Sequence, residues 1–434
     1  MKTQHRYPKA VLARTVALGI GSALALTACA TSAPPAGGED AGPIATLAVE
    51  VHHDFITGVS GAGINVLDQC EPPIEDPSWQ LVPYTDLQQL AFREASLGST
   101  DNDLFFLLDS WASPRLTNLL EPLSGYQEAD PIEEFEGISP DLFAPYQRDG
   151  EFYGVPIRTT TVVLMYDDQR VTEVPTTIEE LVDTATSLAG TNADGQPTYG
   201  IRFSSVDDLV SWARAFGGDL ITSDYEIAFT EEPTIRALEA LKELYDAKAI
   251  PENFASLTAD DWLRMEQQGQ VAMTLRGSTY YGNLDDPEVS RIAGHVGVTT
   301  FPSSEDIGGA VDVPAATWYM SIPANATNKQ GAWDFIQCVS SVQSTIDMAL
   351  NNNTPVRPSA FEAPEVAEAT VPALGAAQAA VLEVARPGLP GFDGQVEAVA
   401  ILQEAMVAAI TGQQSPEDAM KAAAEQIAPL LEQD

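Results

Sequence analysis

Cysteine and histidine, the side chains best suited to metal and redox chemistry, are few in this chain of 434 residues. There are three cysteines, Cys29, Cys70 and Cys338, and four histidines, and no two cysteines have Cys-x-x-Cys spacing. A structural zinc site or an iron–sulfur cluster needs several such ligands at short spacing, so we expect neither metal nor cofactor. His52 and His53 are adjacent, and adjacent side chains of an extended segment point to opposite faces rather than to a shared metal. Cys70 and Cys338 could form a disulfide outside the cytoplasm.

Motifs for hydrolysis or nucleotide binding are missing from the sequence. It contains no Gly-x-Ser-x-Gly elbow, no His-Glu-x-x-His pair and no GxxxxGK[ST] phosphate loop. Two carboxylates facing one another could hydrolyse a glycosidic bond, but 63 Asp and Glu make such pairs uninformative. We therefore expect no catalytic residues and no enzyme activity, with an extracellular glycoside-active enzyme as an alternative.

The first residues are typical of a secretory signal. The chain starts with four basic and no acidic side chains, at Lys2, Arg6, Lys9 and Arg14. The apolar run from Val16 to Leu26 follows, which fits a signal and is shorter than the roughly 20 residues of a membrane span. The run ends in Leu26-Thr27-Ala28-Cys29, which resembles a bacterial lipobox. That resemblance implies removal of residues 1–28, lipidation of the Cys29 thiol and a place on the extracellular face of a bacterial cell membrane. An ordinary signal followed by a chance cysteine is the alternative.

Acidic side chains dominate the composition. The chain has 63 Asp and Glu against 21 Lys and Arg, a formal net charge of −42. Without residues 1–28, 17 basic side chains remain against the same 63 acids, which gives −46. Such a field repels nucleic acid and anionic lipid head groups, so we expect no nucleic-acid partner. It also disfavours anionic ligands unless a local basic pocket prevails, although solubility alone would explain the charge.

The chain beyond the signal is too long for one compact core. Its 406 residues exceed the common domain size of about 100–200 residues, so we expect two lobes. Residues 29–44 are small, polar and rich in proline and glycine, which predicts a flexible tether.

Short apolar runs alternate with helix-like stretches beyond residue 44. The expected strands are Thr46–Val51, Leu104–Leu108, Val162–Tyr166, Val271–Leu275, Val296–Thr300 and Trp318–Ile322. The expected helices include one that starts at Thr177, one over Pro233–Ala247, one through Trp333–Val339 and one that follows Ser415. This alternation predicts an α/β fold with mainly parallel sheets flanked by helices.

Eight segments carry a resemblance to a known family. They are 103–109 with 120–123, 153–157 with 164–167, 175–181, 216–218, 268–273, 331–336, 353–357 and 415–419. Residues 175–181, Pro-Thr-Thr-Ile-Glu-Glu-Leu, are for example similar to a Pro-x-Thr-Trp-Glu-Glu-Leu helix start. In this order the segments resemble the extracellular solute-binding proteins that feed ABC importers, in the sugar-binding branch that includes maltose-binding protein.

The resemblance implies a two-lobe, periplasmic-binding-protein-like fold of type II. Lobe one would comprise 45–157 and 302–354, and lobe two would comprise 158–301 and 355–434. A solute, expected to be a mono- or oligosaccharide, would bind between the lobes at the carboxyl ends of strands. The protein, a monomer, would then deliver it to two permease subunits driven by a separate ATPase.

The chain departs from the family between the first strand and residue 79. Residues 64–77 contain Pro72, Pro73 and Pro77 where the family usually has a full helix. Because proline disrupts helix interiors, we expect a short helical turn and a loop there.

A sugar offers hydroxyls, which carboxylates and amides bind, and C–H faces, which pack on aromatic rings. By its matching position Asp109 would bind ligand, with a helix N-cap as the alternative role. Trp111 and Trp318 could stack on a ring or cover the lobe surface. Asp54 and Thr160 could add polar contacts to the ligand. The alternative for Asp54 is a solvated loop residue, and the alternative for Thr160 is a β-branched residue that suits a hinge strand. The sugar-binding branch has a ligand glutamate near Thr160, and its absence here argues against the same sugar.

The second lobe would supply Asp207, Arg276, Tyr280, Tyr281 and Arg357. One of the two tyrosines would stack on the ligand, since the family commonly has a tryptophan nearby. Arg276 could bind ligand or pair with an acid, and Arg357 could bind ligand or form a hinge salt bridge. A polyamine or another cation also suits acids and rings, so it remains the alternative ligand class. A ligand-free adhesion or signalling module is a further alternative.

Overall fold

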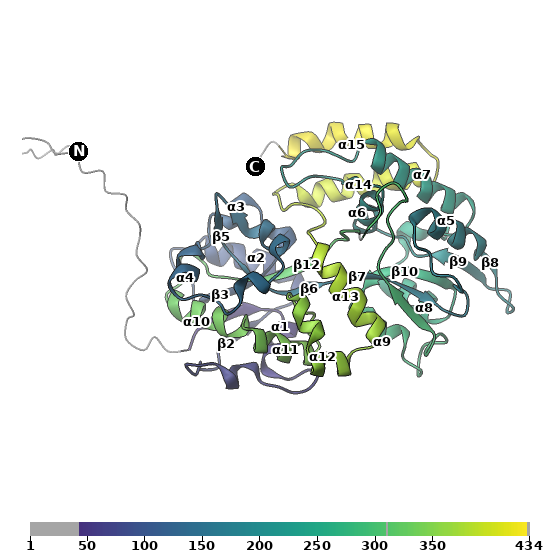
Figure 1. Cartoon of the computed structure of the whole chain (residues 1–434). Helices are drawn as coiled ribbons and strands as arrows, with labels where there is room; N and C mark the ends of the chain where they lie inside the picture. Colours follow the sequence, from purple (N-terminus) through teal and green to yellow (C-terminus); the bar gives the residue numbers. More distant parts are fainter. Residues whose placement is uncertain (1–42, 310, 432–434) are drawn as a thin grey trace, which may run out of the picture. The chain divides into compact units, whose positions relative to one another are not determined.

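The computed structural model describes residues 43–309 and 311–431. The predicted signal peptide, the lipidation site Cys29 and residues 29–42 of the predicted tether lie outside the described residues. Two five-stranded sheets organise the described chain (Figure 1).

The first sheet has the strand order β2-β1-β3-β12-β6. Its strands are β1 (Ala45–Ala48), β2 (Ser78–Leu81), β3 (Leu104–Leu108), β6 (Val155–Thr160) and β12 (Ala316–Ser321). Strand β1 is parallel to β2 and β3, whereas β12 is antiparallel to both β3 and β6. All five residues of β3 are buried, as a continuous apolar run predicts for a strand covered on both faces.

The second sheet has the order β11-β7-β10-β9-β8. Its strands are β7 (Val162–Asp167), β8 (Gly190–Thr191), β9 (Pro197–Ile201), β10 (Val271–Gly277) and β11 (Val296–Thr299), and a separate hairpin pairs β4 (Gln147–Arg148) with β5 (Glu151–Phe152). Strand β7 is antiparallel to both β10 and β11, and β8 is antiparallel to β9. The expectation of mainly parallel sheets was therefore wrong, and both sheets are mixed. A segment that returns from the other sheet, such as β12, enters against the direction of its neighbours.

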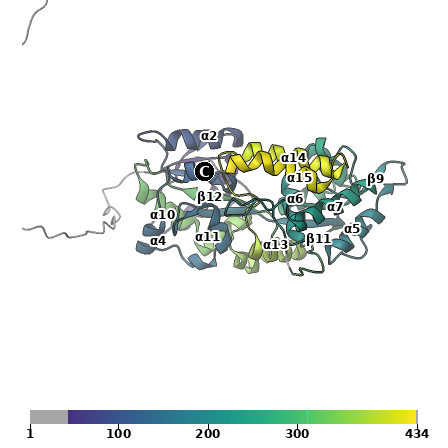
Figure 2. The same cartoon turned by 90° about the horizontal axis from the view of Figure 1, so that it is seen from above.

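The helices occupy the stretches between these strands. Their bounds are α1 (Glu50–Thr57), α2 (Tyr84–Ala95), α3 (Pro114–Thr117), α4 (Ser124–Ala129), α5 (Ile178–Ser187), α6 (Val206–Ala215), α7 (Glu232–Asp246), α8 (Ala259–Gln267), α9 (Tyr281–Leu284), α10 (Lys329–Val339), α11 (Val342–Leu350), α12 (Pro364–Ala369), α13 (Pro372–Val384), α14 (Gln395–Ile410) and α15 (Pro416–Leu431). Helices α14 and α15 pack side by side and contact α7, while α13 packs on β7 and β11 (Figure 2).

The predicted helix starts agree with the structure in their capping contacts. The Thr177 hydroxyl accepts a hydrogen bond from the Glu180 N–H at 3.2 Å, which caps α5. The Ser415 hydroxyl accepts from the Asp418 N–H at 3.2 Å at the start of α15. These local signals were readable because a cap needs only residues within one turn of each other.

The expected first strand was too long. It ends at Ala48, and α1 begins at Glu50, so His52, His53 and Asp54 lie on a helix rather than in an extended segment or loop. Strands β2, β6 and β9 were not anticipated.

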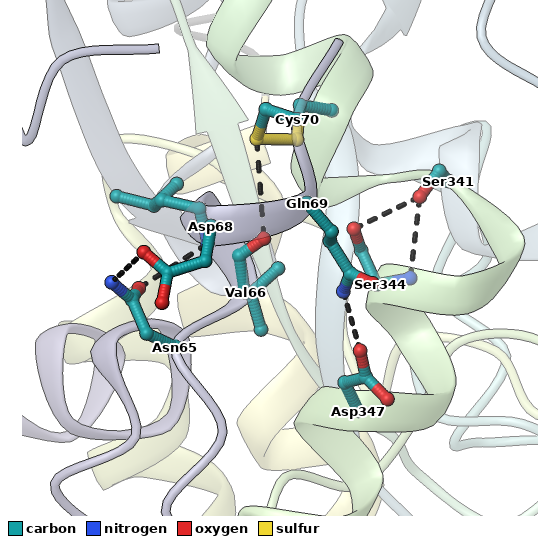
Figure 3. Close-up of a disulfide and its surroundings, with 10 residues drawn as sticks. Asn65, Val66, Asp68, Gln69, Cys70, Ser341, Ser344 and Asp347 are labelled. Carbon is teal, nitrogen blue, oxygen red and sulfur yellow. Dashed lines mark hydrogen bonds between the residues drawn. A yellow bond between two sulfur atoms is a disulfide. The ribbon is translucent and has the colours of Figure 1, made fainter. Parts of the chain in front are cut away.

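A disulfide ties the irregular segment after α1 to α10. Residues 64–77 form only one short 3-10 helix, Val66–Gln69, as the prolines predicted. Cys70 is bonded to Cys338, 268 residues later, with 5.5 Å between the Cα atoms. Beside it, the Gln69 amide donates to the Asp347 carboxylate of α11 (Figure 3). These two links replace the packing that a full helix would give.

We expect the double substitution C70S/C338S to lower the free energy of unfolding by about 2–5 kcal/mol, because it releases a long loop in the unfolded chain. Urea unfolding would measure this, with the reduced wild type as the matched control. Equal midpoints for oxidised, reduced and substituted protein would show that the bridge contributes nothing to stability.

Candidate ligand-binding site

Three aromatic side chains from separate elements gather at the carboxyl ends of β2 and β3. Tyr84 begins α2, Trp111 ends the 3-10 helix that follows β3, and Trp318 lies on β12 opposite Leu108. The ring centroids are 5.5 Å apart for Trp111 and Trp318, and 5.7 and 6.0 Å from Tyr84 to Trp111 and Trp318. Both indoles are about nine-tenths buried, whereas Tyr84 is 53% exposed. We call Tyr84, Trp111 and Trp318 the aromatic triad.

Asp109 lies beside the triad with its carboxylate in the protein interior. It follows β3 directly, and its two oxygens accept hydrogen bonds from the Thr317 N–H at 3.1 Å and the Ser110 N–H at 2.6 Å. Burial raises its pKa to about 7, and the nearby charge of Asp207 adds to this, while the two N–H donors act in the opposite direction. A carboxyl group with such a pKa can donate or accept a hydrogen bond near neutral pH.

Asp207 lies on α6, the helix that follows β9 of the second sheet, and its charge acts on Asp109 and Tyr84. Asp207 is in contact with solvent. Desolvation by the surrounding protein nevertheless raises the pKa of its carboxyl group, and the charge of Asp208 raises it further. Burial and the charges of both Asp109 and Asp207 raise the pKa of Tyr84, so the two carboxylates lie near one phenol. Asp208, by contrast, is used internally, because it caps α6 through Ser205 and pairs with Arg202 at 3.1 Å.

Other contacts join the same two parts of the chain. Arg148 donates to the Ala112 carbonyl at 3.0 Å and to the Tyr225 hydroxyl at 3.3 Å, and Tyr225 donates to the Gly391 carbonyl at 3.3 Å. A Cβ atom on Gly391 would lie 2.9 Å from the backbone of Ala112, so only glycine permits this approach. These contacts hold the segments around Tyr225 and Gly391 against Ala112, the residue that follows Trp111 of the aromatic triad.

The sequence also matches a family model. Residues 79–373 match the model described as bacterial extracellular solute-binding protein, which covers more than half of the chain. This chain belongs to that family.

Solved structures show the same fold. The sugar-binding protein MalE from Xanthomonas citri is similar with a TM-score of 0.75 and 19% identity over 90% of this chain and 98% of that one. The cyclic alpha-maltosyl-1,6-maltose binding protein from Arthrobacter globiformis gives 0.73 and 18%, over 91% and 100%. Maltose-bound MalE3 of T. maritima gives 0.69 and 22%, over 89% and 99%.

In this solute-binding protein, Asp109, Trp111, Trp318 and Asp207 are brought together, as the sequence anticipated. Tyr84 was missed. Its position just after a strand and at the first turn of a helix was the available signal, because carboxyl ends of strands gather at one edge of a sheet. Within residues 43–309 and 311–431, no helix is long and apolar enough to cross a membrane.

Other predicted contacts lie elsewhere. Asp54 is on α1, and its carboxylate pairs with His53 at 3.0 Å. Thr160 ends β6 where the chain passes to β7, and a Cβ on Gly277 would lie 2.8 Å from its methyl group. Thr160 is therefore at the junction of the two sheets.

The two predicted arginine ligands need correction. Arg276 is buried and donates to Glu266 at 2.5 Å, and its guanidinium lies 3.8 Å from the ring centre of Tyr280. Arg357 is buried and donates to the carbonyls of Glu133, Glu134 and Ser340. Both guanidinium groups are held by the protein interior, because burying a charge requires such partners.

The tyrosines after β10 also make contacts of their own. Tyr281 donates to Asp285 at 3.4 Å, and Tyr280 covers Arg276. In the described part of the chain, no ring contact joins either tyrosine to the aromatic triad. Their role in binding stays a prediction.

The pKa of Asp109 sets a pH dependence of stability. Between its ordinary value of 3.8 and about 7, the folded protein holds a proton that the unfolded chain has lost. The contribution of Asp109 to the free energy of unfolding therefore falls as the pH rises through this window. We expect D109N, which cannot ionise, to become more stable relative to the wild type from about pH 4 to about pH 8, as measured by urea unfolding. A constant difference would contradict the raised pKa.

The buried pair Glu266 and Arg276 gives a second prediction. E266Q should lower the free energy of unfolding by about 3–5 kcal/mol, because it leaves an uncompensated buried charge. Chemical denaturation measures the loss, and E266L/R276M, which removes both charges, should recover part of it. Unchanged stability of E266Q would show that the pair is not desolvated as described.

Proposed function

We propose that this solute-binding protein captures a sugar between the aromatic triad with Asp109 on one side and Asp207 on the other. The observation that carries the proposal is the meeting of three rings and two carboxylates drawn from both sheets. Rings pack on the C–H faces of a sugar, and carboxylates accept hydrogen bonds from its hydroxyls. The solved relatives support this choice, since one is maltose-bound MalE3 and another is a cyclic alpha-maltosyl-1,6-maltose binding protein.

Capture without conversion fits the contacts of this site. Asp109 is fixed by two backbone N–H groups, which suits a hydrogen-bonding partner held in one orientation. Closure of two lobes around the sugar would shift a two-state equilibrium by the difference in its affinity for the two forms. The proposed lobes, 45–157 with 302–354 and 158–301 with 355–434, are supported by the sheets except at residues 158–160, which end β6 of the first sheet and so move that boundary to Thr160. One residue, Thr161, links β6 of the first sheet to β7 of the second.

The proposal extends to delivery. The protein would be lipid-anchored at Cys29 on the extracellular face of the cell membrane. As a monomer it would pass the sugar to two permease subunits served by a separate ATPase. The support is the family membership together with the lipobox-like sequence before Cys29.

Neighbouring aspartates provide a matched test. D207N should weaken sugar binding about 10–100-fold, because it removes a charged acceptor, while the melting temperature without ligand stays near that of the wild type. D208N should lower the free energy of unfolding by about 2–4 kcal/mol through loss of the charge that pairs with Arg202, with little effect on affinity. A thermal-shift screen with sugars and polyamines would identify the ligand, and calorimetry would measure both variants.

Three results would contradict the proposal: stabilisation by polyamines alone, product release from sugar oligomers, or no response to any sugar.

A further inference from the structure

Arg158 is a partly buried cation without a partner. It lies on β6 directly opposite Trp318 of β12. Its Nε atom is buried and makes no hydrogen bond. Within residues 43–309 and 311–431, no acceptor is in hydrogen-bonding distance of this guanidinium and no carboxylate oxygen lies within 4.0 Å of it. A guanidinium carries five N–H donors, and in the described residues the protein supplies no acceptor for those of Arg158.

Other buried and half-buried arginines in the described chain have a partner for at least part of the guanidinium, although the Nε atoms of Arg148, Arg202 and Arg357 are also buried without a hydrogen bond. Arg202, Arg214 and Arg276 pair with carboxylates, and Arg170 and Arg357 donate to backbone carbonyls. Acids outnumber bases threefold in this chain, with 63 against 21, yet no acid of the described residues forms an ion pair with Arg158. Burial lowers the pKa of Arg158, and no carboxylate opposes that effect. The protein therefore provides no counter-charge at this position.

His52, whose pKa the charge of Arg158 lowers, cannot provide a counter-charge, because an imidazole is either neutral or positive. His52 is fully buried between Phe106, at 4.6 Å, and Trp318, at 4.5 Å between ring centroids, and neither of its nitrogens is hydrogen-bonded. Burial and the charge of Arg158 hold the pKa of His52 well below its usual value, so the imidazole is neutral. Trp318 thus separates a buried neutral histidine from the rest of the aromatic triad.

Arg158 also lies on the same side of its strand as Thr160. Side chains two residues apart in a strand share a face, and Thr160 reaches the junction between the sheets beside Gly277. Trp318, opposite Arg158, is part of the aromatic triad. The unpaired guanidinium is therefore beside Trp318 of the proposed sugar site.

We propose that the ligand is an acidic sugar, a uronate or an oligosaccharide containing one, whose carboxylate is bound by Arg158. This rests on the proposed function and narrows its substrate class. The hydroxyls of the sugar would bond to Asp109 and Asp207, and a ring face would pack on the aromatic triad. A pair of hydroxyls could satisfy the donors of Arg158 but would leave its buried charge uncompensated, whereas a carboxylate matches the planar fork and neutralises it.

The charge balance favours one negative charge over two. A phosphate dianion would also fit a guanidinium, but the charges of Asp109 and Asp207, which both act on Tyr84 of the same site, would repel the extra charge. The net charge of the whole chain acts weakly here, because salt screens distant surface charges beyond roughly 8 Å at physiological ionic strength. The nearby guanidinium of Arg158 therefore determines the preference for a ligand with one negative charge.

The experiment compares neutral sugars with their own uronates on the full mature chain. Calorimetry would measure the affinities of glucose and glucuronate, galactose and galacturonate, and disaccharides that contain each. The wild type should bind at least one uronate more tightly than its neutral partner. R158Q should weaken binding of that uronate at least about 30-fold while leaving the neutral sugar within about threefold. R158K, which keeps the charge but loses the fork, should give an intermediate loss.

Arg115 offers a matched control. It is exposed and lies over Phe92 rather than over a ring of the aromatic triad, so R115Q makes the same change in charge and should leave both affinities unchanged. Melting temperatures without ligand show whether R158Q is folded.

Equal affinity of the wild type for a neutral sugar and its uronate would overturn the proposal while leaving sugar capture intact. An equal loss of both affinities in R158Q, or tighter binding of a sugar phosphate, would overturn it in the same way. If neither neutral nor acidic sugars bind, the proposed function itself fails.

Discussion

The site depends on the pairing of β12 with β3 and β6. This strand comes from a segment more than 200 residues after β3, and it enters the first sheet antiparallel to both neighbours. The pairing places the Thr317 N–H on the carboxylate of Asp109 and sets Trp318 opposite Arg158. It also brings the Trp318 indole against Trp111. A shift of one residue in this register would turn Trp318 to the other face of the sheet and dismantle the site.

The acidic composition has different local consequences in different places. Asp208, Asp219 and Glu266 pair with buried arginines and so stabilise the second half of the fold. Among the described residues Asp109 and Asp207 form no ion pair, and desolvation by the surrounding protein raises the pKa of both, although Asp207 keeps contact with solvent. Groups held in this way are costly in the empty protein, because desolvation disfavours their charged forms. Asp109 lies beside the aromatic triad, the charge of Asp207 acts on Tyr84, and Arg158 lies opposite Trp318.

Local patterns were readable where short-range physics decides the structure. The apolar run Leu104–Leu108 had the bounds of β3, and the Thr177 cap started α5 where expected. The prolines at 72, 73 and 77 ruled out a long helix in their segment. Asp109 and Trp111 were identified because they directly follow a strand, and family likeness supplied their roles. The first strand was overextended because Val49 and Val51 continue an apolar pattern that the chain uses to enter α1.

By itself the sequence determined an α/β chain and the strand end that carries Asp109, since these follow from apolar periodicity. The family and the two-lobe arrangement were predicted from the resemblance of ordered segments to extracellular solute-binding proteins. Only the tertiary structure decided strand direction, and with it the mixed sheets. It also decided that Arg276 and Arg357 face inward to Glu266 and to carbonyls, while Arg158 has no partner. The sequence alone does not distinguish Arg158, Arg276 and Arg357 from one another. The role of each arginine depends on which acceptors distant segments bring within reach, and residues such as Trp318 and Arg158 meet only through long-range pairing.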